Sequence, residues 1–245
     1  GPETLLPPDP FLGGAATLWQ PRRGYRAGVD PVMLAASVPA KQGECLLDLG
    51  CGVGAAGLCV AARVPDVAVV GVERQADYAA LAQRNGMDTV VADIADLPAD
   101  LRARSFDHVI VNPPYFDRAR SGRAEDAGRE AAMGEETPLH TWLEVAAARL
   151  KPKGYLHLIH RMARLPDVLA GLDGRLGSIA VLPLAARAGR APEMMIIRAR
   201  KGGRADFCLS APIVVHEGAQ HDVDGDDYTP LISKVLREGA ALWPA

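Results

Sequence analysis

The chain has 245 residues, of which 49% are hydrophobic and 23% are charged, and these values predict one well-packed α/β domain with an elaboration. Its formal net charge is −3, from 27 Lys and Arg against 30 Asp and Glu, which argues against a large basic surface for nucleic acid. Because the chain has neither a long apolar run nor a signal-peptide pattern, we expect a cytoplasmic protein with no membrane partner. We interpret Gly1-Pro2 as a scar of tag cleavage.

The cysteines and histidines lack the spacing of a metal site. No Cys-x-x-Cys pair occurs, and the histidines match neither a metal pattern nor a catalytic triad, so we expect no metal and interpret both residue types as structural. The cysteines are Cys45, Cys51, Cys59 and Cys208, and the histidines are His108, His140, His157, His160, His216 and His221.

The first forty residues predict little regular structure. Residues 3–14 are rich in Pro and Gly and are expected to be irregular, and residues 16–20 are expected to form a short strand. Asp30 followed by Pro31 predicts a helix start, with Asp at the N-cap and Pro at the first helical position.

From Glu44 onward, short apolar runs alternate with helical stretches. The expected strands are 44–48, 67–72, 88–92, 106–111, 154–160 and 178–183, and the expected helices are 54–63, 75–85, 137–150 and 163–172. This alternation predicts a doubly wound, mostly parallel sheet with helices on both faces.

The end of the chain breaks this alternation. Two apolar runs, 192–199 and 206–215, predict an antiparallel hairpin at the sheet edge with its turn at 201–203. A last helix is expected at 229–238. The polar stretch 117–136 is expected to be a loop near the ligand, with a disordered insertion as the alternative.

A glycine-rich turn follows the first strand of the alternation. Gly50, Gly52 and Gly54 allow the backbone to approach a ligand closely, and the same spacing also fits a dinucleotide-binding turn. Glu73 ends the next strand, where its carboxylate can accept hydrogen bonds from two ribose hydroxyls. Asp48 precedes the turn, and its negative charge favours an ammonium group over a pyrophosphate.

The tetrapeptide Asn112-Pro113-Pro114-Tyr115 directly follows the strand at 106–111. The Asn112 side chain and the Pro113 carbonyl offer acceptors for both protons of a planar amino group, and Tyr115 offers a ring to stack on its face. The alternative is a rigid structural turn. A base inside a duplex cannot reach such a site, so the target must be flipped out or lie in a loop.

These two motifs together resemble class I S-adenosylmethionine-dependent methyltransferases that act on planar nitrogens. The resemblance implies a Rossmann-like, seven-stranded sheet with an antiparallel edge strand. It also implies that Asp93, after the third strand, binds the adenine of the cofactor. The alternative is that Asp93 only caps the next helix.

The segment 18–30, with the sequence Leu-Trp-Gln-Pro-Arg-Arg-Gly-Tyr-Arg-Ala-Gly-Val-Asp, narrows the resemblance. This opening, the Asn-Pro-Pro-Tyr-Phe sequence and the tail 227–230 are similar to those of bacterial enzymes that methylate N6 of adenine 37 in valine tRNA. The resemblance implies a methyltransferase domain at 41–245 after an N-terminal extension at 1–40, and an RNA partner. The cofactor residues it implies are Asp48, Gly50, Gly52, Gly54, Glu73, Asp93 and Asn112. The catalytic residues it implies are Asn112, Pro113, Pro114 and Tyr115, and the substrate contacts are Gln20, Tyr25, Arg26 and Phe116.

Four alternatives remain open at this point. Asn-Pro-Pro-Tyr also serves enzymes that methylate a glutamine amide in a protein, but the N-terminal helical domain usual in those enzymes is not recognisable in this sequence. Enzymes acting on guanine N2 in ribosomal RNA usually carry Phe where this chain has Tyr115. A domain that binds cofactor and RNA without turnover is the non-enzyme alternative, and an NAD-dependent oxidoreductase is the weakest. The sequence does not predict the oligomeric state.

Overall fold

The computed structural model of the protein describes residues 7–22, 27–114 and 137–243, which form a large mixed sheet and a small one. In the small sheet, β1 (Asp9–Phe11) pairs antiparallel with β2 (Ala16–Leu18). The large sheet has nine strands in the described residues, in the order β10-β8-β9-β7-β6-β3-β4-β5, with β11 also paired to β8. Its strands are β3 (Cys45–Leu49), β4 (Ala68–Glu73), β5 (Asp88–Val91), β6 (Phe106–Val111), β7 (Leu150–Arg161), β8 (Gly177–Ala185), β9 (Met194–Arg200), β10 (Cys208–Leu209) and β11 (Ile213–Val214).

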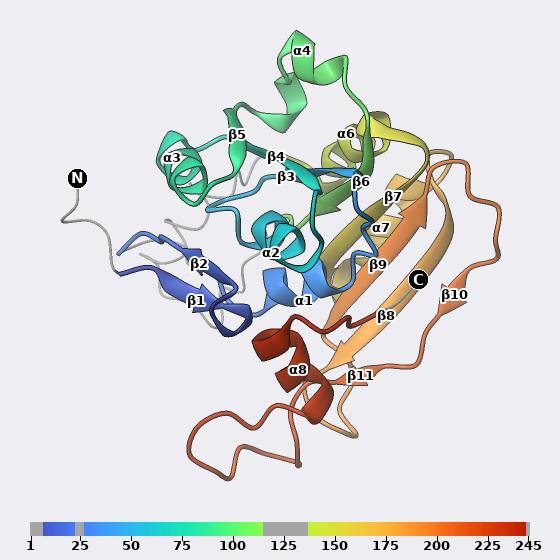
Figure 1. Cartoon of the computed structure of the whole chain (residues 1–245). Helices are drawn as coiled ribbons and strands as arrows, with labels where there is room; N and C mark the ends of the chain where they lie inside the picture. The colour runs from blue at the N-terminus through green and yellow to red at the C-terminus, as the bar shows by residue number, and fades with distance from the viewer. Residues whose placement is uncertain (1–6, 23–26, 115–136, 244–245) are drawn as a thin grey trace.

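Helices cover both faces of the large sheet (Figure 1). They are α1 (Asp30–Ala36), α2 (Ala55–Arg63), α3 (Ala76–Arg84), α4 (Ala99–Arg102), α6 (Leu139–Arg149), α7 (Leu165–Leu172) and α8 (Pro230–Glu238), with 3-10 turns η2 (Leu12–Gly14), η3 (Ile94–Asp96) and η4 (Met162–Arg164). Among the described residues, no helix is long and apolar enough to cross a membrane.

The strands are apolar on both sides because each face of the sheet carries its own core. On one face, α6 and α7 pack Leu143 and Val168 against Phe106 and Leu156. The core of the other face gathers apolar residues of α1, α2 and α8 around the strands: Leu34, Val60, Ile232, Leu46 and Ile110. Burial on both faces is the normal environment of a parallel strand, which explains the unbroken Val, Ile and Leu runs.

The structure confirms the predicted doubly wound fold. The antiparallel strand, however, does not lie at the edge of the sheet as predicted. β9 lies between β7 and β8 and is antiparallel to both. The run 206–215 does not form a hairpin with it, because β10 and β11 pair with β8 instead, and in parallel. The physical reason is that Met195, Ile196 and Ile197 are fully buried, so this strand needs neighbours on both edges and helices on both faces.

The N-terminal part is also more regular than expected. Residues 3–14, predicted to be irregular, contain β1 and η2, while the strand expected at 16–20 is present as β2. Helix α1 begins at Asp30 itself with Val29 at the N-cap, one residue before the predicted position. The short helix α4 was not predicted, since its four residues are too few to show a helical period.

Candidate functional site

The carboxyl ends of β3, β4 and β6 meet at a cavity of about 850 Å³, a volume that includes its open mouth. Four residues that the sequence places at or just after strand ends line it together: Asp48, Glu73, Asp93 and Asn112. Ligands of doubly wound sheets bind at this end of the strands. The structure therefore brings the candidate cofactor residues and the first residue of the Asn-Pro-Pro-Tyr motif into one site.

The glycine turn lines the cavity through Gly50 and Gly52. Gly50, Gly52 and Gly54 have φ values of 69°, 56° and 94°, a region that favours glycine. At Gly50 there is a second reason for glycine, because a Cβ atom would collide with the ring of Trp142. Trp142 also lines the cavity. This contact could not be predicted from the sequence, because Trp142 lies on α6, far from the turn in the chain.

Asp48 is almost completely buried, and its carboxylate contacts the first turn of α2. Its Oδ2 atom accepts a hydrogen bond of 3.1 Å from the backbone N–H of Gly57. Burial, together with the nearby Glu73, raises the pKa of Asp48 to about 7, although the hydrogen bond from Gly57 acts in the opposite direction. A buried carboxylate of this kind is stabilised by a cation and destabilised by another anion. The pair Asp48 and Glu73 therefore fits a positively charged ligand and disfavours a pyrophosphate.

The backbone of the two neighbouring turns holds Glu73 in place. Its Oε1 accepts from Gly52 N–H at 3.0 Å and its Oε2 from Gln75 N–H at 2.7 Å. Burial raises its pKa, against the effect of these backbone bonds. Each carboxylate oxygen has two lone pairs, so this fixed group can also accept hydrogen bonds from ribose hydroxyls.

Asp93 caps a short helical turn at the edge of the cavity. Its Oδ1 accepts from Ala95 N–H at 2.9 Å, which caps η3, and the residue also lines the cavity. The cap that the sequence left open is therefore present, and the predicted contact with the cofactor stays a prediction.

The described part of the Asn-Pro-Pro-Tyr motif lies at the end of β6. Asn112 is half-buried, Pro113 is buried, and Asn112 and Pro114 line the cavity. Tyr115 and Phe116 lie outside the described residues, as do Tyr25 and Arg26.

Gln20 is placed differently from the expectation that it contacts a ligand. It is buried, its Nε2 donates to Asp9 Oδ2 at 2.6 Å, and its Oε1 accepts from Ala27 N–H at 2.6 Å. Both polar ends of the side chain are thus used inside the protein, whereas Ala27 itself lines the cavity.

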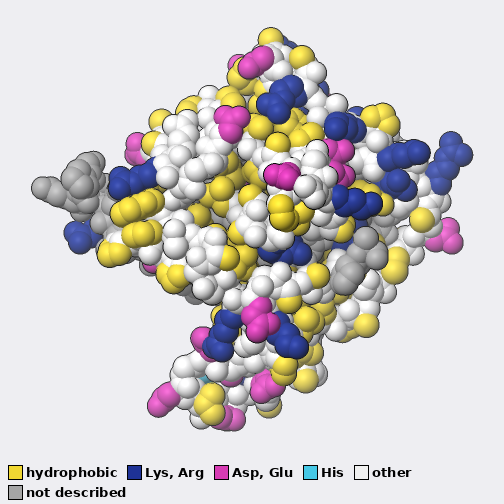
Figure 2. All heavy atoms as spheres, viewed as in Figure 1, with side chains coloured by type: hydrophobic (Ala, Val, Ile, Leu, Met, Phe, Trp, Pro, Cys, Tyr) yellow, Lys and Arg dark blue, Asp and Glu magenta, His cyan; other side chains and the backbone are white. Residues whose placement is uncertain are grey.

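The basic residues near the C-terminal strands do not form one patch. Arg187 and Arg190 lie after the carboxyl end of β8, Arg200 and Lys201 lie at the opposite end of the sheet, and Arg198 is buried. In the view of Figure 2, Lys and Arg side chains gather toward the upper right, over the region of α6 and the start of β7. The start of β7 lies at the amino ends of the parallel strands, whereas the cavity lies at their carboxyl ends.

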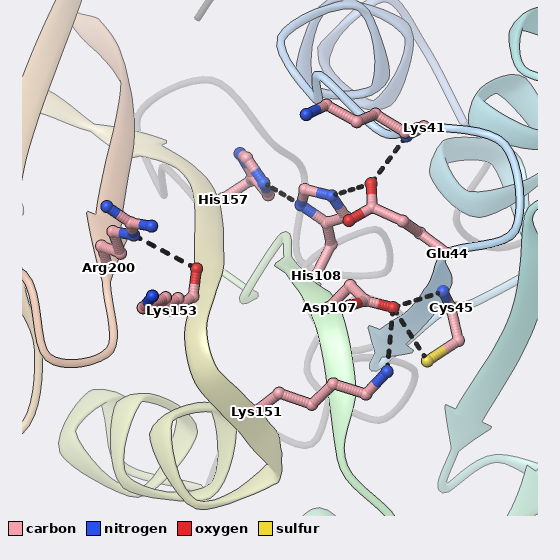
Figure 3. A network of polar contacts seen from close by, with 9 residues as sticks. All are labelled: Lys41, Glu44, Cys45, Asp107, His108, Lys151, Lys153, His157 and Arg200. Carbon is pink, nitrogen blue, oxygen red and sulfur yellow. Dashed lines mark hydrogen bonds and ion pairs between the residues drawn. The ribbon is translucent and has the colours of Figure 1, made fainter.

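His108 of β6 and His157 of β7 make polar contacts between neighbouring strands (Figure 3). His108 Nε2 lies 3.0 Å from Glu44 Oε1, and His108 Nδ1 lies 2.9 Å from His157 Nε2. Burial, with His108 and Arg198 nearby, lowers the pKa of His157 well below its usual value, so this ring is neutral at pH 7. Among the described residues, no group of three or more His, Cys, Asp or Glu is arranged to hold a metal ion.

A second small network lies beside this one. Asp107 Oδ2 accepts from Cys45 N–H at 2.9 Å and from Lys151 Nζ at 3.2 Å. Burial alone would raise the pKa of Asp107, but these donors outweigh it and lower the pKa. The network joins the starts of β3, β6 and β7, which is a structural role (Figure 3).

Comparison with known proteins agrees with this geometry. Residues 28–181 match the model of the methyltransferase small domain family. The chain is 33% identical over 148 residues to a tRNA1(Val) (adenine(37)-N6)-methyltransferase of Actinobacillus succinogenes, covering 56% of this chain and 61% of that protein. It is 38% identical over 76 residues to the release factor glutamine methyltransferase of Escherichia coli, covering 29% of this chain and 27% of that protein.

Both matches span less than two thirds of the relatives' own lengths. The fold is similar over most of its extent to a solved structure from Agrobacterium tumefaciens, described as a predicted O-methyltransferase. The TM-score is 0.71 at 28% identity, and the match covers 87% of this chain and 98% of the other.

Proposed function

Because this chain belongs to the methyltransferase small domain family, with S-adenosylmethionine as its cofactor, we propose that it methylates N6 of an adenine in RNA, with adenine 37 of valine tRNA as the target. The observation that carries this proposal is the shared cavity. Asn112 and Pro114, from the motif expected to hold a planar amino group, line the same space as Asp48 and Glu73, which fit a cationic ligand.

Residues at the ends of three strands bind different parts of the cofactor. Asp48 faces the ammonium end, Glu73 accepts from the ribose hydroxyls, and Asp93 accepts from the adenine amino group. The glycine turn at 50–54 lets the backbone approach the ligand closely. When bound, S-adenosylmethionine supplies an electrophilic methyl group on a positively charged sulfur.

The base-binding residues prepare a poor nucleophile for attack. The lone pair of an aromatic amino group is delocalised into its ring. Asn112 Oδ1 and the Pro113 carbonyl accept the two N6 protons, which favours a pyramidal nitrogen. Tyr115 stacks on the base, with Phe116 beside it. Most of the rate then comes from positioning and aligned dipoles, without a general base. The nitrogen–carbon bond forms as the sulfur–methyl bond breaks, and the methylated nitrogen, which is positively charged and acidic, then releases one proton to solvent.

The proposal includes an RNA partner, a cytoplasmic location, and the division into an extension at 1–40 and a methyltransferase domain at 41–245. The similarity to the Actinobacillus succinogenes enzyme supports a tRNA substrate. The overall charge of −3 means that the RNA contacts must be local.

The deciding experiment measures transfer of a radiolabelled methyl group to unmodified valine tRNA and to the same transcript with guanine at position 37. Label on the first RNA and none on the second is expected. Equal label on both would place the reaction at another base.

A second candidate substrate is a glutamine side chain in a protein, supported by the similarity to the Escherichia coli release factor enzyme. An amide –NH2 is planar and presents the same two protons to Asn112. Label on a release factor, with none on either RNA, would replace the first proposal with this one.

A further inference from the structure

One wall of the cavity comes from the N-terminal segment. We define the N-terminal wall as residues 18–22 and 27–31. Ala27 and Pro31 of this wall line the cavity, as do Val53 and Ala56. The wall is not part of the large sheet, so something other than strand pairing must hold it against the glycine turn.

Asn85, the residue after α3, makes that connection. Its Oδ1 accepts from Trp19 N–H at 2.6 Å, and its Nδ2 donates to the Trp19 carbonyl at 3.0 Å. Nδ2 also donates to the Val53 carbonyl at 2.9 Å. One side chain therefore pairs with both backbone groups of a wall residue and with the glycine turn.

A neighbouring contact of Arg84 also holds Trp19 against the end of α3. The guanidinium of Arg84 lies over the ring of Trp19, 4.1 Å from its centroid. Within the wall, Gln20 Oε1 accepts a hydrogen bond from the Ala27 N–H, which joins the two parts of the wall. The wall is thus held together by Gln20, and Trp19 is tied to the glycine turn through the side chain of Asn85.

We propose that Asn85 is a positioning residue for the cofactor, which fixes the N-terminal wall against the glycine turn at the amino-acid end of the bound molecule. The order of the strands supports placing the amino-acid end of the cofactor at this wall. Asp93 follows β5 and Glu73 ends β4, while Asp48 lies in β3 and the glycine turn follows that strand. A ligand with its adenine at Asp93 therefore reaches Val53 with its amino-acid end. The inference rests on the cofactor placement proposed above.

The test is calorimetric binding of two ligands to the whole chain. S-adenosylhomocysteine carries the amino-acid end, whereas 5′-methylthioadenosine shares the adenosine but lacks that end. Asn85→Ala removes three hydrogen bonds and should weaken S-adenosylhomocysteine binding about tenfold, while binding of 5′-methylthioadenosine stays within about twofold. Gln83→Ala is the matched control, because its side chain donates to the Thr89 carbonyl, outside both the wall and the turn; it should change neither affinity.

A second variant covers the case in which Asn85→Ala does not fold. Asn85→Asp has the same shape and keeps the acceptor for Trp19 N–H, but it turns a carboxylate oxygen toward the carbonyls of Trp19 and Val53. It should weaken S-adenosylhomocysteine binding at least as much as the Ala variant. Unchanged S-adenosylhomocysteine affinity in a folded Asn85 variant, or equal losses for both ligands, would overturn the inference. Failure of the unaltered chain to bind either ligand would instead refute the cofactor placement.

Discussion

Replacing Asp48 with Asn should stabilise the protein at neutral pH and at the same time weaken its hold on S-adenosylmethionine. Burial raises the pKa of Asp48 from its ordinary value of 3.8 to about 7. Between these values the folded protein binds more protons than the unfolded chain, so the free energy of unfolding falls as the pH rises. Above about pH 7 the loss of unfolding free energy caused by ionising the buried Asp48 reaches its full value of about 4 kcal/mol, at about 1.4 kcal/mol per pH unit.

The amide introduced by Asp48→Asn would keep an oxygen for the Gly57 N–H but carry no charge, so this pH-dependent cost disappears. At pH 5 the cost in the unaltered protein is only about 1.7 kcal/mol by the same relation. The stability advantage of Asp48→Asn should therefore grow by about 2.5 kcal/mol between pH 5 and pH 8, measured by urea unfolding without ligand. An advantage that does not change with pH would refute the buried-charge argument.

Cofactor binding should show the opposite preference, because a cationic ligand binds the ionised form of Asp48. With a pKa of about 7, about a tenth of Asp48 is ionised at pH 6 and half at pH 7, so S-adenosylmethionine affinity should rise about fivefold over this interval. Asp48→Asn should bind more weakly and lose this pH dependence. Calorimetry in buffers of different ionisation enthalpy measures the proton released on binding. Binding without proton release in the unaltered protein would contradict the assignment.

Three further changes test the remaining parts of the site. Asn112→Ala should lower the methyl transfer rate at least about 100-fold while S-adenosylmethionine still binds, and retained turnover would remove Asn112 from the mechanism. Glu73→Ala should weaken S-adenosylmethionine binding about 10- to 100-fold, because it removes the proposed ribose acceptor and the partner of Gly52 N–H; unchanged affinity in calorimetry would exclude that role. Gly50→Ala should lower the free energy of unfolding more than Gly52→Ala. Both variants lose about 1–2 kcal/mol because φ is positive, but only the Cβ atom at position 50 collides with Trp142. Equal losses of stability in urea unfolding would mean that the Trp142 ring moves aside.

The parts of the site that could be predicted are those that follow from local pattern and strand direction. Asp48, Glu73 and Asn112 end or follow apolar runs, and parallel strands bring their carboxyl ends to one edge, so their meeting at one cavity follows from the alternation alone. The roles proposed for these residues are still predictions. The cap made by Asp93 was likewise visible as an acidic residue before a short helical turn.

The parts that could not be predicted depend on contacts between distant segments. Asn85 is followed by Gly86 and so looks like an ordinary helix end, and nothing near it in the sequence points to Trp19, which is 66 positions away. Trp142 has the spacing of a core residue on α6, and its contact with Gly50 exists only once the sheet is assembled. The edge position expected for 192–199 was wrong because a strand pattern shows burial but does not name the neighbours of the strand.

The position of β9 has a consequence for how the chain is made. β7 and β8 are both synthesised before β9, yet each pairs with β9 rather than with the other. Until residues 194–200 leave the ribosome, both strands present an edge of unpaired backbone groups flanked by fully buried side chains such as Leu156 and Val181. At ordinary rates of translation, the interval from the end of β8 to the end of β9 lasts on the order of a second. During that interval the nascent chain is most exposed to pairing with another copy, and arrival of β9 closes both edges at once.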